Sequence, residues 1–315
     1  MSDSNGFYYE AFNENKIDDL VYLFKLEGKI ISKSYILNKF KFDQISSYKN
    51  YIGYIVYDLD NVPATFIGGF YMLIKVQKEN LNAIQIGDVI TNPKHRGKGL
   101  FVNNASHFFE YLRNNTNFDL VFGFPNENSS YGFFNKLGWH RNSNFQILTY
   151  NFKVVNIYGL FHKFKKITPF YNFYKNFILN LFVINKDLNL DIDSVESGVV
   201  KDVNFLKYKK RASNSVFIKF FRNYYFIKFV DGLQIDFVKI ADLKSIKRDL
   251  NILSFLFGIK KIETFITSNS KIKNDLISLG FCVDTKREFN TGYLFLHNSE
   301  RKEEFFFSIC DTDEF

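Results

Sequence analysis

Cysteine is nearly absent from this sequence of 315 residues, which contains only Cys282 and Cys310. Two thiols supply neither a disulfide framework nor a cysteine zinc site, so we expect no metal centre and a reducing environment. Long apolar runs are also missing. The longest extends from Phe177 to Ile184, is interrupted by Asn180 and is far shorter than the roughly 20 residues that span a bilayer. Since the N-terminus also lacks a signal-peptide pattern, the sequence predicts a cytoplasmic protein without a transmembrane segment.

Acidic residues are outnumbered, because 33 Asp and Glu stand against 41 Lys and Arg and give a net charge of +8. An excess of positive charge favours a polyanionic partner. Phosphate-bearing small molecules explain this charge as well as nucleic acid does, and an AT-rich genome that enriches Lys, Asn, Ile and Phe is the alternative. The basic residues are scattered along the chain rather than gathered in a recognisable binding module, so we expect no nucleic-acid partner.

A glycine-spaced basic loop is the most informative feature that the sequence does contain. The stretch Asp88–Leu100 is predicted to be a buried strand, a proline-containing turn and a loop that opens a helix. Backbone N–H groups at a helix N-terminus favour a phosphate, and Gly97 and Gly99 let the backbone approach it. Lys94–Arg96 and Lys98 add positive charge. The loop lacks the endings of a Walker loop and of a dinucleotide fingerprint, so an anion site of another kind is predicted.

A second informative segment follows this loop. After a predicted helix over Leu100–Asn114, the apolar run Phe118–Phe124 is predicted to be a short buried strand that ends before Pro125. The next stretch, Asn128–Trp139, is predicted to be a short helix closed by Gly138. The order of strand, loop, helix, strand and helix favours an α/β fold.

These two segments together resemble the GNAT superfamily of acyl-CoA-dependent N-acyltransferases. Lys94–Gly99 is similar to their Gln/Arg-x-x-Gly-x-Gly/Ala loop, which cradles the pyrophosphate of coenzyme A, with Lys replacing the first Gln/Arg. Asn128–Trp139 is similar to a segment that splays from the preceding strand and lets pantetheine insert. The resemblance implies acyl-coenzyme A as the co-substrate. The residues that it places at coenzyme A are Val89, Ile90, Thr91, Arg96, Gly97, Lys98, Gly99, Leu100, Asn126 and Phe134.

The patterning divides the chain into three parts. Residues 1–153 are predicted to form an acyl-CoA-binding domain, 154–198 connecting helices and a linker, and 199–315 an acceptor-binding domain. Gly68-Gly69 marks a bulge or a close backbone approach in the first domain. The elements expected there are helices over Ile17–Leu26 and Ser34–Phe42, and strands over Tyr51–Tyr57, Ala64–Val76, Ile84–Thr91 and Asn144–Phe152.

The segment Ile157–Asn185 is basic and aromatic. We expect connecting helices that are broken at Thr168-Pro169, because proline is not tolerated inside a helix. The same pattern fits a helix that binds an anionic membrane surface, and this alternative stays open. The polar run Asn185–Gly198 is expected to be an exposed turn or linker.

The C-terminal part repeats the first part in degraded form. Ser278–Phe281, with the sequence Ser-Leu-Gly-Phe, stands where Lys-Leu-Gly-Trp stood in the first part. The loop Ala241–Lys247 contains no Gly-x-Gly, so this part is expected not to bind coenzyme A. The fold class is therefore an α/β mixed sheet in tandem GNAT-like domains, the second of which is degenerate. Its expected elements are strands over Val216–Phe220, Tyr224–Val230 and Leu233–Ile240 and a helix over Leu243–Phe257.

The whole chain is similar to the two-domain nucleotide-sugar N-acyltransferases of bacterial surface-polysaccharide biosynthesis, which acylate a dTDP-linked amino-dideoxyhexose. Phe205–Lys209 is similar to their Phe-Leu-x-Trp-Arg motif, and the ending Asp311–Phe315 is similar as well. The resemblance implies that the second domain binds the nucleotide sugar for O-antigen or capsule synthesis. Candidates for stacking on the base and for meeting the phosphates are Tyr208, Lys209, Lys219, Arg222 and Tyr224.

Acyl transfer to an amine requires a general base, donors for the tetrahedral oxyanion and an acid for the leaving thiolate. The expected oxyanion donors are backbone N–H groups of Val89–Thr91. The superfamily places its tyrosine acid four residues before the Gly-Phe pair, where this chain has Phe134, so Tyr131 is the candidate substitute. Asp88 and His107 are the candidate bases, and deprotonation of the amine in solution is the alternative.

Two other functions remain open. One is acylation of a protein lysine or a peptide amine, which requires an open acidic or peptide-shaped groove. The other is a non-catalytic protein that holds acyl-coenzyme A or another polyanion, an alternative that Phe134 favours and that the intact glycine loop disfavours. A homodimer is also left open by the sequence.

Overall fold

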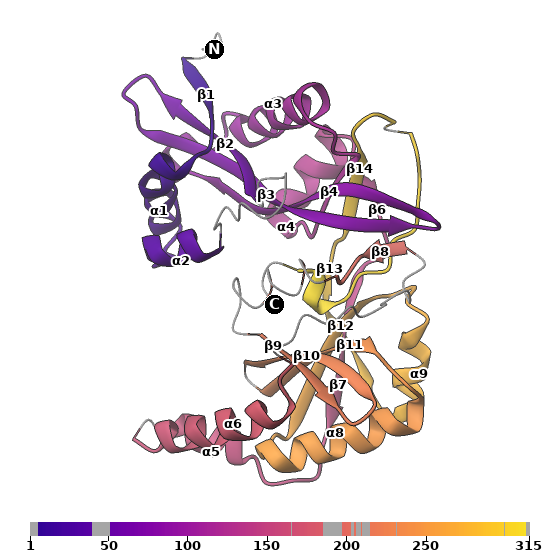
Figure 1. Cartoon of the computed structure of the whole chain (residues 1–315). Helices are drawn as coiled ribbons and strands as arrows, with labels where there is room; N and C mark the ends of the chain where they lie inside the picture. The colour runs from indigo at the N-terminus through magenta and orange to yellow at the C-terminus, as the bar shows by residue number, and fades with distance from the viewer. Residues whose placement is uncertain are drawn as a thin grey trace. The chain divides into compact units, whose positions relative to one another are not determined.

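The chain forms two compact units, each built on a mixed β-sheet (Figure 1). The computed structural model describes residues 6–39, 51–164, 166–184, 197–202, 205, 209, 215–230, 232–298 and 300–312. Unit 1 joins Met1–Asn142 to Asn290–Phe305, and unit 2 joins Ser143–Phe289 to Phe306–Phe315.

The sheet of unit 1 has the strand order β1-β2-β3-β4-β5-β14-β6. Every neighbouring pair in this order is antiparallel except β4 and β5, which run parallel. The strands are β1 (Phe7–Ala11), β2 (Tyr51–Asp58), β3 (Pro63–Val76), β4 (Glu79–Thr91), β5 (Leu120–Gly123), β6 (His140–Arg141) and β14 (Gly292–Phe295).

Helices cover both faces of this sheet, with α3 on one face and α1 on the other (Figure 1). Alternate β4 residues Ile84 and Ile86 face α3 and pack with its Phe108 and Leu112 in one core, which also contains Trp139. The helices and tight turns are η1 (Glu14–Lys16), α1 (Ile17–Leu26), α2 (Lys33–Lys39), η2 (Pro93–His95), α3 (Leu100–Asn115), α4 (Glu127–Tyr131) and the π-helical turn η3 (Gly132–Lys136).

Unit 2 has the strand order β13-β7-β12-β11-β10-β9. The strands of this sheet are β7 (Phe145–Asn151), β9 (Val216–Phe220), β10 (Asn223–Val230), β11 (Gly232–Lys239), β12 (Lys261–Thr267) and β13 (Cys282–Phe289), whereas the short strand β8 (Ser197–Val199) pairs with β3. The helices of unit 2 are α5 (Ile157–Lys163), α6 (Thr168–Phe182), α8 (Leu243–Phe257), α9 (Ile272–Leu279) and the turn η4 (Ile309–Asp311).

The two sheets share one topology. In each, three antiparallel strands lead through a helix to a parallel strand, namely β4 through α3 to β5 and β11 through α8 to β12. In each sheet, the strand that lies beside this parallel strand comes from the other half of the sequence. Strand β14 pairs with β5 and β6 in unit 1, whereas β7 pairs with β12 and β13 in unit 2 (Figure 1). The tandem, mixed α/β architecture that the sequence predicts is confirmed.

The strand exchange moves the boundaries relative to the predicted ranges 1–153, 154–198 and 199–315. The strand predicted at Asn144–Phe152 forms as β7 but completes the sheet of unit 2 rather than the first domain. Residues 290–305, predicted to lie in the second domain, supply β14 to unit 1. Apolar alternation shows that a segment is a strand but not which sheet accepts it, because either open sheet edge offers the same backbone partners.

Most other helices and strands form at the residues that local sequence signals predict. The helix Ile17–Leu26 forms as expected, and Pro169 occupies the first turn of α6, where its missing N–H costs no hydrogen bond. The predicted helix Ser34–Phe42 corresponds to α2, and its residues 40–42 lie outside the described part of the chain, as do residues 185–196 of the predicted linker. None of the helices in the described ranges combines the length and apolar character of a membrane span.

Candidate active site

Strands β4 and β5 separate at a bulge in β4. Their parallel pairing extends from Ala83 to Ile86 on β4 and ends where Ile86 meets Gly123. The register against β3 then shifts, because Gly68 pairs with Asp88 and Gly69 with Ile86, which leaves Gly87 as the extra residue. The bulge predicted from Gly68-Gly69 is therefore present. Beyond it, β4 stays with β3 and leaves β5, so an opening forms between the two parallel strands.

Backbone N–H groups of β4 point into this opening. The N–H of Asn92 donates to the carbonyl of Ala64 at 2.9 Å, so residue 92 directs its backbone groups toward β3. Because these directions alternate along a strand, Thr91 and Val89 direct theirs to the opposite side, where β5 has ended. The two amides are therefore placed as donors for a ligand in the opening.

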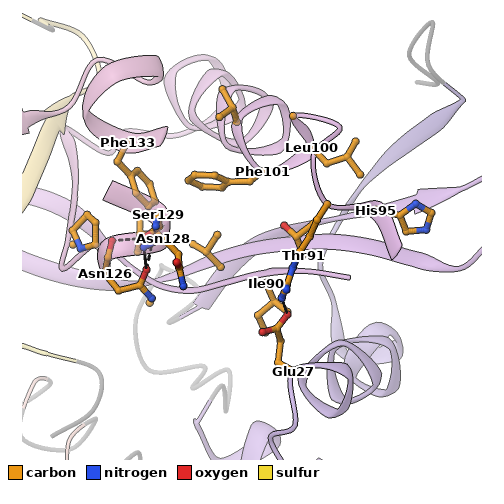
Figure 2. A pocket seen from close by; sticks show the side chains of 18 of the residues that line it. Glu27, Ile90, Thr91, His95, Leu100, Phe101, Asn126, Asn128, Ser129 and Phe133 are labelled. Carbon is orange, nitrogen blue, oxygen red and sulfur yellow. Dashed lines mark hydrogen bonds and ion pairs between the residues drawn. The ribbon is translucent and has the colours of Figure 1, made fainter. Parts of the chain in front are cut away.

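A pocket of about 800 Å³ occupies the opening and continues to the N-terminus of α3 (Figure 2). Three groups of residues line it. The end of α1 supplies Phe24 and Glu27 together with Lys29; β4, its loop and α3 supply Ile86, Gly87, Val89, Ile90, Thr91, His95, Arg96, Gly97, Gly99, Leu100, Phe101 and Val102; the segment after β5 supplies Gly123, Phe124, Pro125, Asn126, Asn128, Ser129, Phe133 and Trp139.

The loop before α3 presents its backbone to the pocket. Asn92 caps the turn η2 by accepting the N–H of Lys94 at 3.1 Å, and Gly97 and Gly99 then adopt φ values of 77° and 72°. Both values lie in the left-handed region that glycine tolerates best. The first-turn amides of the 16-residue helix α3 have no intrahelical acceptor, as in any helix. Its N-cap is Gly99, which has no side chain that could cap them. Open amides at a helix N-terminus favour an anion, and the pyrophosphate site expected from the loop sequence stays a prediction.

Charged side chains of the loop are held by carboxylates on other elements. The guanidinium of Arg96 pairs with the carboxylate of Glu27 at the end of α1, and both residues line the pocket. The imidazole Nε2 of His95 lies 3.1 Å from a carboxylate oxygen of Asp58. Lys98 does not line the pocket, since its ammonium lies over the ring of Phe7, 5.6 Å from the centroid.

The opposite wall is built by α4 and the π-helical turn. Asn126 caps α4 by accepting the N–H groups of Asn128 and Ser129, each at 3.1 Å. The turn then directs Phe133 into the pocket, with its ring centroid 4.4 Å from that of Trp139. Phe134, which the resemblance placed at coenzyme A, does not line the pocket, because its ring packs under the guanidinium of Arg141 at 4.0 Å.

None of the three candidate catalytic side chains lines the pocket. Tyr131 is 62% exposed, with its ring near the ammonium of Lys136. His107 is exposed on α3, where its ring contacts that of Tyr9 with centroids 4.3 Å apart. Asp88 is buried on β4 beside the bulge. Among the three, only Asp88 lies on a strand that forms the opening.

Asp88 shares the α1 face of the sheet with two other polar residues. Residues paired directly across neighbouring strands point to the same face, and the pairs Gly68–Asp88 and Phe70–Gln85 bracket the bulge. The hydroxyl of Tyr51 lies over Gly68, where a Cβ atom would meet it at 2.1 Å. The amide of Gln85 is fully buried and has no hydrogen-bond partner among the described residues. The α1 face beside the bulge therefore carries hydrogen-bonding side chains in an otherwise aromatic environment.

The corresponding helix N-terminus in unit 2 is capped by a carboxylate. The carboxylate of Asp242 caps α8 by accepting the N–H of Ser245 at 2.8 Å. This places a negative charge on the amides that remain open in α3, and no glycine precedes the helix in the left-handed conformation. That unit 2 does not bind coenzyme A stays a prediction.

Three of the five candidate acceptor-binding residues, Lys219, Arg222 and Tyr224, lie on the β9–β10 hairpin of unit 2. Tyr208 lies outside the described residues. Lys209 is buried, and its ammonium donates to the carbonyl of Thr312. Lys219 and Tyr224 are register partners on β9 and β10, with the ammonium 5.5 Å from the ring centroid, and Arg222 is exposed in the turn between them.

Unit 2 also contains a buried ionic cluster that the sequence analysis missed. The ammonium of Lys201 lies 2.9 Å from a carboxylate oxygen of Asp236 and 3.7 Å from one of Asp311. Burial lowers the pKa of Lys201, but the two carboxylates outweigh it and raise this pKa well above its usual value. The hydroxyl of Ser308 donates to Asp236 at 2.8 Å, so the cluster ties the C-terminal segment to β11.

Comparison with known proteins agrees with the geometry of unit 1. Residues 19–141 match the family described as the acetyltransferase (GNAT) domain. Unit 1 contains an acetyltransferase (GNAT) domain. The matched residues include the bulge, the glycine loop and α4, so the pocket belongs to an acyl-CoA-dependent N-acyltransferase with acyl-coenzyme A as co-substrate. No curated protein sequence matches the chain.

Solved structures extend the likeness of fold to both units around this GNAT domain. A GCN5-related N-acetyltransferase from Kribbella flavida matches 92% of this chain and 72% of its own, with a TM-score of 0.59 and 9% identity. A candidate N-acyltransferase from Enterococcus faecalis has the same coverage and TM-score at 12% identity. A candidate acetyltransferase from Pyrococcus horikoshii matches 98% of this chain and 96% of its own, with a TM-score of 0.58 and 12% identity. At these identities the likeness shows the fold.

The structure adds residues to the GNAT pocket that the sequence analysis did not name. Glu27 and Phe24 come from the end of α1, far from the loop in sequence, and only folding brings them to it. Phe101 and Phe133 meet with ring centroids 5.0 Å apart, and Gly132 makes room for them, since a Cβ there would lie 2.3 Å from the ring of Phe101. Gly132 stands directly before Phe133 in the sequence, and this glycine is the sequence signal for the close approach.

Proposed function

We propose that this protein transfers an acyl group from acyl-coenzyme A to the amino group of a dTDP-linked amino-dideoxy sugar, in the cytoplasm, during O-antigen or capsule synthesis. The opening between β4 and β5, with its glycine loop and GNAT match, supports the acyl-transfer part of this proposal. The buried polar side chains beside the β4 bulge support a hydroxyl-bearing amine as the acceptor.

Backbone groups would hold the acyl donor. The amides from Arg96 to Leu100 would donate hydrogen bonds to the pyrophosphate, because the left-handed glycines leave room for it and the helix dipole supplies positive potential. Pantetheine would then extend between β4 and β5 along the apolar wall that contains Phe133. This direction brings the thioester carbonyl to the amides of Val89 and Thr91, which would stabilise the oxyanion.

Asp88 would act on the acceptor amine. Its carboxylate lies on the α1 face of β4, beside the bulge where the strands separate. Attack forms the C–N bond, breaks the C–S bond and releases one proton from nitrogen, which a carboxylate near the amine accepts or passes to water. Neither His107 nor Tyr131 lines the pocket, so we propose that water protonates the leaving thiolate and that positioning of the two substrates supplies much of the rate enhancement.

Gln85 favours a sugar over a simple aliphatic amine as the acceptor. A buried amide without a partner among the described residues costs free energy, and a ligand that offers hydroxyl groups would recover it. The Gln85 side chain lies on the same face as Asp88, on the other side of the bulge. An amine and a neighbouring hydroxyl on one sugar ring would suit this pair of side chains.

A product screen tests the proposed function. The purified chain would be incubated with several acyl-coenzyme A esters and with dTDP-linked and UDP-linked amino sugars, and products would be detected by mass spectrometry. We expect an acylated dTDP-sugar, and we expect dTDP to stabilise the protein in thermal unfolding more than UDP does. Acylation of a lysine peptide, with equal indifference to both nucleotides, would show that the acceptor is a peptide amine.

The variant Asp88→Asn separates a role of Asp88 in turnover from a role in coenzyme A binding. We expect this variant to keep its thermal stabilisation by coenzyme A and to lose turnover, with a changed pH profile. Unchanged turnover would show that the amine is deprotonated elsewhere.

A further inference from the structure

Helix α6 is apolar on two opposite sides, although only one side packs against unit 2. Its inner side buries Tyr171 and Leu179 in the core of that unit. The hydroxyl of Tyr171 donates to the carbonyl of Phe257, and that of Tyr174 donates to the carbonyl of Leu256, both at 2.8 Å. These contacts anchor α6 on the end of α8. Packing among the described residues therefore explains the inner side of α6 and does not explain the outer one.

The outer side of α6 exposes a row of large apolar side chains. Phe170, Phe173, Phe177 and Leu181 are 73%, 77%, 58% and 63% exposed. Their spacing of three or four residues places them along one stripe of the helix. Solvent-facing positions of a helix are usually polar, so four consecutive apolar positions on one stripe indicate a surface that is covered by a partner.

Helix α5 and the turn that follows expose further apolar side chains next to α6. Leu160 and Phe164 are 49% and 55% exposed, and α5 lies beside α6 at the edge of unit 2 (Figure 1). We call six exposed residues of α5, its C-cap and α6 the apolar face. It consists of Leu160, Phe164, Phe170, Phe173, Phe177 and Leu181.

The charged residues of the two helices and their connecting turn have one sign. The sequence contains no Asp or Glu between Glu127 and Asp187, a stretch that includes both helices. Exposed lysines accompany the apolar residues at Lys153, Lys163 and Lys166. Lys175, also on α6, is half-buried over the ring of Phe229, which leaves it with a packing role. An acid-free, lysine-bearing surface with exposed phenyl groups complements a negatively charged, apolar partner.

We infer that the apolar face binds the surface of an anionic membrane. Phenyl and leucyl side chains insert at the level of the lipid headgroups, and neighbouring lysines meet the lipid phosphates. A second copy of the chain is a poorer occupant, because a two-fold interface would set this basic, acid-free surface against its own copy. Membrane binding would hold the enzyme peripherally, and it is independent of the acceptor proposed above.

Vesicle sedimentation of the full chain tests this inference. We expect the protein to sediment with vesicles of phosphatidylcholine and phosphatidylglycerol, and not with vesicles of phosphatidylcholine alone. The variant Phe173→Ser/Phe177→Ser should bind the anionic vesicles about tenfold more weakly, because two phenyl groups no longer leave water. Its control is Ile30→Ser/Leu59→Ser, which removes two exposed apolar side chains of unit 1 and should bind like the wild type.

Charge-reversal variants test the same inference in a second vesicle experiment. Lys163→Glu/Lys166→Glu should weaken binding at least about tenfold, whereas Lys78→Glu/Lys302→Glu, an equal change at exposed lysines of unit 1, should change it far less. Circular dichroism and coenzyme A binding confirm that each variant is folded. Binding that neither pair of substitutions on α5 and α6 weakens would overturn the inference. So would no binding to anionic vesicles, or a dimer in solution that Phe173→Ser/Phe177→Ser dissociates.

Discussion

The carboxylate of Glu27 pairs with the guanidinium of Arg96 at the pocket where we propose that the pyrophosphate of coenzyme A binds. The pair joins the end of α1 to the loop before α3, and it places a negative charge beside an anion site. Bound pyrophosphate would compete with Glu27 for the same guanidinium. This contact therefore predicts that Glu27 limits the affinity for coenzyme A.

Glu27→Gln should tighten coenzyme A binding by up to about fivefold, because the pair is partly exposed and such pairs contribute at most ~1 kcal/mol. Isothermal calorimetry at low salt measures the effect, which should shrink as salt is added. Asp18→Asn is the matched control, since Asp18 forms an exposed pair with Lys33 away from the pocket. Weaker binding in Glu27→Gln, equal to that of Arg96→Gln, would show instead that Glu27 positions the guanidinium.

Gly97→Ala/Gly99→Ala should abolish the thermal stabilisation that coenzyme A gives. A Cβ at either residue meets no protein atom within 4 Å, so the variant should fold, at a cost of about 1–2 kcal/mol per residue for the left-handed backbone. The added methyl groups would stand where the backbone must approach the phosphate. Gly138→Ala has a similar φ of 71° and equally open surroundings but does not line the pocket, so it should keep the stabilisation. Normal calorimetric binding by the double variant would contradict the proposed pyrophosphate site.

Tyr131→Phe should lower kcat by less than about tenfold, equivalent to 1.4 kcal/mol of transition-state stabilisation. The reason is its position, since the side chain is 62% exposed and does not line the pocket. Steady-state kinetics with a saturating acyl donor measures the change. A loss of several hundredfold with unchanged binding of coenzyme A would identify Tyr131 as the acid.

Lys201→Met should destabilise the protein by about 3–5 kcal/mol, because it leaves the buried carboxylate of Asp236 without its cation. Lys201→Met/Asp236→Asn should recover at least half of that loss, since both members of the ion pair are then neutral. Chemical denaturation measures both values. Lys33→Met, which removes an exposed pair with Asp18, should cost less than about 1 kcal/mol. Equal destabilisation by Lys201→Met and by the double variant would show that packing rather than charge dominates.

The same ion pair predicts how stability depends on pH. Burial raises the pKa of Asp236, but Lys201, Cys310 and Ser308 outweigh it and hold this pKa below 3.8. The contribution of Asp236 is therefore complete above pH 3.8 and is lost as the pH falls through the folded-state value. The pKa of Lys201 lies above 10.5, so its contribution is complete below pH 10.5 and is lost as the pH rises further. Denaturation midpoints should fall less steeply toward low and high pH in Lys201→Met/Asp236→Asn than in the wild type, because other paired groups such as Glu263 still titrate in both.

The sequence by itself determined the local elements and the anion loop. Gly97 and Gly99 before an amphipathic helix carry the geometry of the loop, because left-handed backbone and open helix amides depend on neighbouring residues alone. Pro169 likewise fixed the start of α6. Constraints of this kind act between neighbouring residues, so they can be predicted from the sequence.

Only the tertiary structure decided what stands opposite these elements. It placed β14 in the first sheet and β7 in the second, brought Glu27 to Arg96, and turned Phe133 rather than Phe134 into the pocket. It also buried Lys201 between two carboxylates from separate parts of the chain. Strand exchange, ion pairing and the choice between adjacent rings depend on contacts between distant segments, and the packing that selects them has no periodic signature in the sequence.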